Sequence, residues 1–349
     1  MKTDILIVGC GVAGLYCALN LPEDKKITII TKNEAPKSDS FLTQGGICVL
    51  RDKDDFQAFY EDTMKAGHYE NNPQSVEIMI RSSQDVIGDL VSYGVNFEKD
   101  GKSFHYTREG AHSKPRILFH EDETGKEITS HLLKTARSRA NITLIENYTM
   151  VDLICDGNMC CGIVGHDAGG NFSTIVADYM VLATGGVGGL FKHSTNYPHL
   201  TGDALALALN YDIKLQHIDY IQIHPTTLYT KKDGREFLIS ESVRGEGAIL
   251  LNAKGERFVN ELLVLVLVND GDHLHLGRLI ISTDDLIQRC SAMESVQNII
   301  NDIIQIFGND TNSALDVDTE NEMIHDHTTE VCTQQAENDG LAVMAQCGG

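Results

Sequence analysis

Basic residues are scarce in this chain of 349 residues: 28 Lys and Arg stand against 50 Asp and Glu, which gives a formal net charge of −22. Neutralising nucleic-acid phosphates requires a basic face, so we expect no nucleic-acid partner. Long apolar runs are lacking too, since the longest, Leu262–Val268, has seven residues. Such a run cannot cross a bilayer, and we expect no membrane partner.

The nine cysteines show no C-x-x-C spacing, and their number is odd. A disulfide framework is therefore not expected, and a reducing compartment is. Residues 1–4 lead directly into a predicted strand and leave no room for a signal peptide, so we expect a cytoplasmic location. The length allows two domains, or one large domain with an insertion.

A glycine-rich turn follows the first predicted strand, Ile5–Val8, and precedes a predicted helix over Leu15–Leu19. A second predicted strand, Ile27–Thr31, completes a unit of βαβ length. In this context a G-x-G-x-x-G turn predicts a dinucleotide site, with the diphosphate at the helix N-terminus. The turn consists of Gly9, Cys10, Gly11, Val12, Ala13 and Gly14.

The end of the second strand does not fit a NAD site. A ribose-binding Asp or Glu is expected about 20 residues beyond the glycines, but the strand ends in Thr31-Lys32. Lys32 therefore argues against NAD as the dinucleotide.

Three further segments each have a structural and a functional interpretation. Ser38–Gly46 is either a polar loop or a backbone surface for a flat ring or a diphosphate. Met180–Gly186 is a buried strand that ends in a small-residue turn, and such strand ends pass close to the cofactor in flavin-binding sheets. Thr201–Leu209 predicts a helix whose Asp203 suits the helix dipole and can also meet a ribityl hydroxyl.

Taken in order, these segments resemble the flavoprotein superfamily of succinate dehydrogenases and fumarate reductases, and within it the L-aspartate oxidases, over about residues 1–263. The resemblance implies an α/β fold: a Rossmann-like FAD-binding domain over 1–217, and an inserted α+β capping domain that begins at 218–263. With the glycine turn and the strand end included, the expected cofactor-binding residues are Gly9, Cys10, Gly11, Val12, Ala13, Gly14, Lys32, Asp39, Ser40, Phe41, Leu42, Thr43, Gln44, Gly45, Gly46, Thr184, Gly185 and Asp203.

The resemblance also implies that FAD is held without a covalent bond. Respiratory members of the superfamily carry a flavin-linked His five positions before the Gln of Gln-Gly-Gly. Asp39 occupies that position here, and a carboxylate cannot form the imidazole linkage.

Substrate-binding residues are implied in the same way. Thr107–Ser113 resembles the T-R-E-G-G-H-S segment of aspartate oxidases, whose Glu is linked to the substrate amino group; without the resemblance, Glu109 reads as a solvated acid beside Arg108. Gln222–Thr226 resembles Q-x-H-P-T, and residues 240–248 resemble S/T-E-x-x-R-G-E-G-A. The expected catalytic residues are Glu109, His224, Ser240, Glu241 and Arg244.

The resemblance stops near Leu263. Aspartate oxidases continue with a Pro-Arg-Asp segment whose Arg is the family's candidate base, but this chain reads Val264–Asp270. Residues 264–349 form a truncated or divergent acidic tail, in which we predict one amphipathic helix over about 283–307. His325, His327 and Cys332 lack an evident fourth ligand, so no metal site is expected.

The implied activity is the FAD-dependent oxidation of L-aspartate to iminoaspartate, with O2 or fumarate as acceptor. It belongs to de novo NAD biosynthesis, where quinolinate synthase takes the unstable imine. Because the Pro-Arg-Asp segment and the family's later FAD-lining segments are missing, we expect weakened FAD binding and low turnover. Two alternatives remain: a fumarate reductase or succinate dehydrogenase flavoprotein, against which Asp39 and Glu109 argue, and an inactive flavin-fold remnant whose acidic tail binds a partner.

Overall fold

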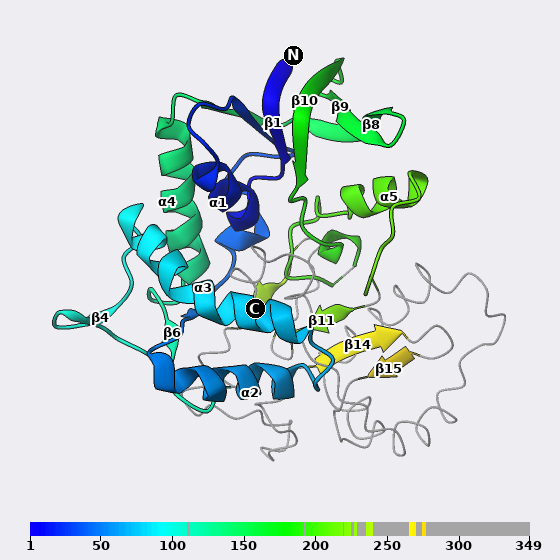
Figure 1. The fold of residues 1–349 in the computed structure, drawn as a ribbon. Helices are drawn as coiled ribbons and strands as arrows, with labels where there is room; N and C mark the ends of the chain where they lie inside the picture. The colour runs from blue at the N-terminus through cyan, green and yellow to red at the C-terminus, as the bar shows by residue number, and fades with distance from the viewer. Residues whose placement is uncertain are drawn as a thin grey trace.

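A six-stranded sheet forms the centre of the computed structural model, which describes residues 1–109, 112–191, 193–218, 220–224, 227–228 and 235–239 and two later strands (Figure 1). The strand order is β7-β2-β1-β10-β9-β8. The first four strands are parallel, and β9 and β8 extend the sheet antiparallel. The strands are β1 Lys2–Val8, β2 Ile27–Thr31, β7 Ile142–Glu146, β8 Thr149–Asp156, β9 Met159–His166 and β10 Phe172–Leu182.

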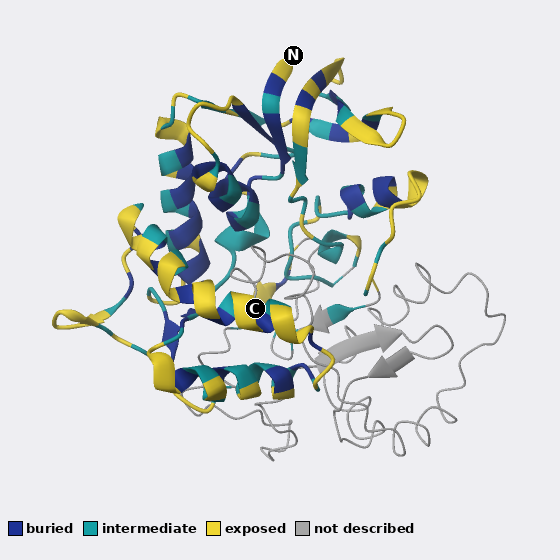
Figure 2. Ribbon diagram, viewed as in Figure 1, coloured by how far each residue is buried: buried dark blue, intermediate teal, exposed yellow. Residues whose placement is uncertain are grey.

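The sheet is covered on both faces because side chains of β1 alternate between them. Ile5 and Ile7 pack in one cluster with Leu15 of α1 (Val12–Asn20) and with helix α4 (Thr124–Ser138). Leu6 and Val8 pack in a second cluster with helix α5 (Asp203–Asn210). Figure 2 shows β1 largely buried between these helices. A continuous apolar strand is what burial on both faces requires.

The remaining elements surround this core. Helices α2 (Phe56–Ala66) and α3 (Pro73–Ser92) pack on each other through a third apolar cluster, and the Asn72 side chain caps α3 by accepting from two backbone N–H groups. The short elements are η1 Asp39–Phe41, β3 Ile47–Cys48, η2 Lys53–Asp55, β4 Lys99–Asp100, β5 Ser103–Phe104, β6 Ile117–Leu118, η3 Gly188–Leu190, β11 Ile221–Ile223, β12 Thr227–Leu228, β13 Phe237–Leu238, β14 Leu265–Asn269 and β15 Leu274–Leu276.

The predicted α/β fold is confirmed. The predicted strand at 27–31 is β2, β1 begins three residues earlier than predicted, and the predicted helix at 201–209 is α5. Strand β14 pairs with β11 across the boundary expected at 264, although no strand was predicted there. The domain boundaries stay predictions, and the helix predicted over 283–307 lies outside the described residues. In the described part of the chain, no helix is both long and apolar enough to span a membrane.

Candidate functional site

The glycine turn after β1 is packed too closely for side chains. Gly9 has a φ of +112°, and a Cβ on it would overlap the carbonyl oxygen of Ala183 at the end of β10. A Cβ on Gly14 would overlap the carbonyl oxygen of Gly9 itself, so α1 could not approach β1 as it does. Close helix–strand approach is the role that the motif assigns to its third glycine.

The parallel pairing of β1 and β10 brings a second predicted segment to this turn. Val8 lies opposite Leu182, and Ala183 N donates to the Val8 carbonyl at 2.8 Å. Thr184 and Gly185 follow directly and therefore leave the sheet beside Gly9, at the carboxyl edge of the parallel strands. That edge is where open α/β sheets bind their ligands.

The loop predicted to face the cofactor, Ser38–Gly46, lies against the N-termini of two helices. The backbone N–H of Val12 in the first turn of α1 donates to Ser40 Oγ at 3.0 Å. The backbone N–H of Gly125 at the start of α4 donates to the Thr43 carbonyl at 2.9 Å. The positive ends of two helix dipoles therefore meet this loop, which favours an anionic ligand such as a diphosphate.

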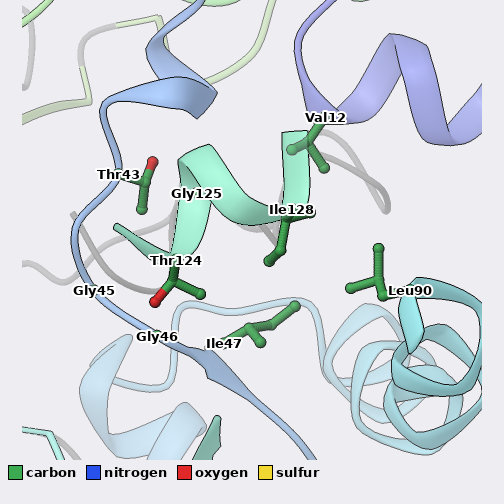
Figure 3. Close-up of a pocket in the computed structure, with 9 residues that line it drawn as sticks. All are labelled: Val12, Thr43, Gly45, Gly46, Ile47, Leu90, Thr124, Gly125 and Ile128. Carbon is green, nitrogen blue, oxygen red and sulfur yellow. The ribbon is translucent and has the colours of Figure 1, made fainter. Parts of the chain in front are cut away.

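A pocket opens between this loop and the three helices around it (Figure 3). Beside the pocket-lining part of the loop, Gln44 Oε1 and Ser38 Oγ are buried and have no hydrogen-bond partner among the residues that the structure describes. Buried polar atoms normally have partners, so these two atoms fit a loop that binds a polar ligand. The pocket is lined by Val12, Thr43, Gly45, Gly46, Ile47, Leu90, Thr124, Gly125 and Ile128.

Lys32 and Asp203, far apart in the sequence, form an ion pair beside the sheet edge. Lys32 Nζ lies 2.9 Å from Asp203 Oδ2 and donates to Thr201 Oγ1 at 2.8 Å. Both charged side chains are about one-third exposed, at 33% and 30%. The pair joins the end of β2 to the first turn of α5, so two residues predicted to contact one cofactor do lie together.

Asp39 ties the loop to a distant segment. Its carboxylate accepts from the Asn196 side-chain amide and from Tyr197 N, the latter at 3.0 Å. Burial raises the pKa of Asp39, and the hydrogen bonds from Tyr197 and Asn196 oppose that effect. The side chain at this position therefore holds the loop in place.

Glu109 lies against the Gln-Gly-Gly end of the same loop. Its Oε1 atom accepts from the backbone N–H of Gly46 at 3.1 Å. Backbone pairing beside both residues holds Glu109 next to Gly46: Ile47 pairs with Leu118, and Thr107 forms a bridge with Ile117. The predicted substrate acid and the predicted cofactor loop are therefore brought together.

A buried arginine fastens the segment that carries Glu109 to helix α2. The Arg116 side chain is 0% exposed and makes two bonds to the Asp55 carboxylate, at 2.9 and 3.1 Å, and one to Asp62 Oδ2 at 2.5 Å. Asp62 also accepts from the backbone and hydroxyl of Ser113. Burial is the largest single effect and raises both pKa values. The bonds from Arg116 to Asp55, and from Ser113 and Arg116 to Asp62, help to outweigh it, so that both pKa values are lowered.

His112 completes this network as a neutral ring. Arg116 Nη1 lies 3.0 Å from His112 Nδ1. Because a guanidinium only donates, Nδ1 accepts and the proton of the ring lies on Nε2. Burial, with the charge of Arg116, lowers the pKa of His112 to about 4.

The other predicted catalytic residues are described only in part. His224 directly follows β11 and is half-buried. Ser240, Glu241 and Arg244 lie outside the described residues, so their roles stay predictions.

Sequence reasoning missed Arg116 and the start of α4. A small-residue pair, Thr124-Gly125, at the start of an amphipathic helix is a signal that could have indicated the α4 contact. An Arg directly before the apolar pair Ile117-Leu118 could have indicated a buried charge, but its two carboxylate partners are more than fifty residues away in the sequence.

Comparisons with known proteins agree with this geometry. A family model described as FAD binding domain matches residues 4–325. An L-aspartate oxidase of Clostridium perfringens (strain 13 / Type A) is 51% identical over 261 residues, which cover 74% of this chain and 59% of that protein. An L-aspartate oxidase of Clostridium acetobutylicum is 46% identical over 266 residues, or 75% of this chain and 61% of that protein. The chain thus spans about three-fifths of the length of these relatives.

Two solved structures share the fold of this chain. Quinol fumarate reductase of E. coli superposes with a TM-score of 0.67 at 27% identity, covering 74% of this chain and 44% of that chain. The Mycobacterium smegmatis Sdh1 complex in the apo form gives a TM-score of 0.63 at 29% identity, covering 73% and 46%.

Proposed function

This chain belongs to the FAD binding domain family, and from that premise we propose that it binds FAD without a covalent bond and oxidises L-aspartate to iminoaspartate. The 51% identity to an L-aspartate oxidase supports the substrate. When bound, FAD accepts the hydride from the substrate Cα. O2 or fumarate is the final electron acceptor, and the second choice is supported by the fold shared with a fumarate reductase.

The chain's own residues would hold the cofactor at the carboxyl edge of the parallel strands. The turn Gly9–Gly14 and the N-terminus of α1 receive the diphosphate. Lys32 and Asp203 lie beside the end of β2, where a ribose is expected. The loop Asp39–Gly46 would face the ring system; among the described residues, its buried Gln44 Oε1 has no hydrogen-bond partner.

We assign binding and orientation of the substrate to the five predicted catalytic residues. Glu109 binds the ammonium group, and its bond to Gly46 N holds that carboxylate against the cofactor loop. His224 and Arg244 bind the carboxylates, for which an imidazole and a guanidinium supply N–H donors. Ser240 and Glu241 complete the substrate site.

The product determines the wider role. Iminoaspartate hydrolyses readily, so an enzyme that condenses it, such as quinolinate synthase, would act next. The proposed pathway is de novo NAD biosynthesis, and the proposed location is the cytoplasm.

The hydrogen bond between Glu109 and Gly46 supports the choice of substrate, because it holds a carboxylate, the group that would pair with an ammonium, against the loop proposed to face FAD. The test is anaerobic mixing of the FAD-loaded protein with L-aspartate and, separately, with succinate. Loss of the flavin colour with L-aspartate alone supports the proposal. Reduction by succinate alone would replace it with the second candidate, a succinate- or fumarate-specific flavoprotein.

A further inference from the structure

The tip of the β8–β9 hairpin carries three free cysteines that the proposed function does not use: Cys155, Cys160 and Cys161. Cys155 and Cys160 are exposed, and they lie directly opposite each other in the antiparallel register. We propose that Cys155 and Cys160 form a dithiol modification site, which a two-electron oxidant of the peroxide class closes to an intrachain disulfide.

The backbone geometry suits this bond. Only Gly157 and Asn158 separate β8 from β9, and Gly157 takes the φ of +58° that so tight a turn needs. Opposed residues of an antiparallel pair have Cα atoms about 4.5–5.5 Å apart. That spacing falls within the roughly 4.4–6.8 Å that disulfides span, so no backbone movement is required.

The side chains also select this pair. The thiol of Cys155 is in hydrogen-bond contact with that of Cys160, whose Sγ in turn lies 3.2 Å from Met180 Sδ on β10. A register shift leaves Cys161 without an opposing residue on β8, and its thiol bonds to the carbonyl of Met159 on its own strand. The register of the hairpin therefore favours a Cys155–Cys160 disulfide over a Cys155–Cys161 disulfide.

The chemistry balances with one molecule of hydrogen peroxide. A thiolate attacks one peroxide oxygen, the O–O bond breaks, and the thiolate becomes a sulfenic acid. The hydroxide that leaves takes up the proton lost when the thiol ionised, which gives one water. The second thiol attacks that sulfur, the S–O bond breaks, and a second water leaves with the thiol proton. The two sulfurs lose two electrons and the peroxide gains them.

The acidity of the Cys155 thiol determines how the rate of disulfide formation should depend on pH. Desolvation and the neighbouring Cys160 raise the pKa of Cys155. Since the thiolate is the reacting form, disulfide formation should become faster as the pH rises. The proposed Cys155–Cys160 site does not depend on the proposed function. Reduction of O2 by the flavin, one of the two electron acceptors proposed above, would release hydrogen peroxide, the oxidant used here.

The test treats the reduced, folded protein with hydrogen peroxide, alkylates the remaining thiols, and digests with a protease that cleaves before aspartate. Cleavage before Asp156 separates Cys155 from Cys160. We expect the fragment 152–155 linked to 156–166, with the mass of two hydrogens lost. Cys161→Ser should retain this link, while Cys155→Ser and Cys160→Ser should abolish it.

The decisive observation is which cysteine, Cys160 or Cys161, is linked to Cys155. The folded protein should favour the Cys155–Cys160 link about tenfold or more over Cys155–Cys161, and unfolding in urea should remove that preference. Absence of any link to Cys155 in the folded protein would overturn the proposal. A link that forms equally well in Cys160→Ser, or only between molecules, would overturn it too.

Discussion

Glu109 Oε1 accepts a hydrogen bond from the backbone N–H of Gly46 at 3.1 Å, and so joins two segments separated by 63 positions in the sequence. One segment is the glycine end of the loop proposed to face the flavin ring. The other carries the acid proposed to bind the substrate ammonium. The first prediction tests whether this carboxylate selects amino dicarboxylates.

Glu109→Gln removes the charge and keeps an oxygen that can accept from Gly46. We expect the Kd for L-aspartate to rise about tenfold or more, since a bond to a charged group contributes about 1.5–3 kcal/mol. The Kd for succinate, which has no ammonium, should change little. Ligand titration of both proteins measures the two constants, and equal weakening for both ligands would contradict the assigned role.

Arg116→Leu should unfold far more easily than the wild type. The substitution leaves the buried carboxylate of Asp55 and the half-buried carboxylate of Asp62 without Arg116, and breaking a buried pair costs about 3–5 kcal/mol. Glu77→Ala is the control, because its ion pair with Arg81 is exposed on α3 and should contribute only about 0.3–0.5 kcal/mol. Urea denaturation measures both, and similar losses in the two variants would refute the account of the network.

His112 makes the folded state sensitive to mild acid. The pKa of its ring is about 4 when folded, against 6.5 for the ordinary value. The unfolded chain therefore binds the proton first, so this contribution is complete above pH 6.5 and is lost as the pH falls toward 4. The loss amounts to at most about 3 kcal/mol.

His112→Asn isolates that contribution, because its side-chain oxygen can accept from Arg116 and does not titrate. The free energy of unfolding of the variant should fall less than that of the wild type between pH 6.5 and 4. If the free energies of unfolding of the two proteins fell in parallel over that range, folding would not change the pKa of the His112 ring.

Two glycine-to-alanine substitutions should have opposite effects. Gly14→Ala would place a Cβ against the Gly9 carbonyl, so we expect a destabilisation of about 1–3 kcal/mol and weaker FAD binding. Gly88 lies in helix α3, and no atom of the other residues that the structure describes lies within 4 Å of the position of a Cβ, apart from its chain neighbours and the helix's own backbone, so Gly88→Ala should stabilise by about 0.5–1 kcal/mol. Thermal unfolding compares the two, and a tolerated Gly14→Ala would remove the packing argument for the turn.

Local patterns were enough to predict the first βαβ unit. The run Ile5–Val8, the glycine spacing and the run Ile27–Thr31 each depend on neighbours in sequence, and the structure has β1, the turn, α1 and β2 in that order. The pairing of β10 with β1 was not predictable in this way, because it joins residues about 174 positions apart. That pairing is what brings Gly185 to the turn.

The sequence named candidate residues for the site but not the contacts between them. Lys32 and Asp203 were both expected near the cofactor, yet no pattern showed that they form an ion pair with each other. Asp39 was read as the replacement for a flavin-linked His, whereas the structure also gives it two partners, Asn196 and Tyr197. Such contacts depend on tertiary packing, which a single sequence does not reveal.

The most direct test of the central claim is an absorbance titration of FAD with the purified protein, followed by anaerobic addition of L-aspartate. The account predicts that the oxidised flavin band shifts on binding, that denaturation releases the flavin intact, and that L-aspartate then removes the band. A flavin spectrum left unchanged by the protein at every concentration would contradict the claim that the glycine turn and the loop at 39–46 hold FAD.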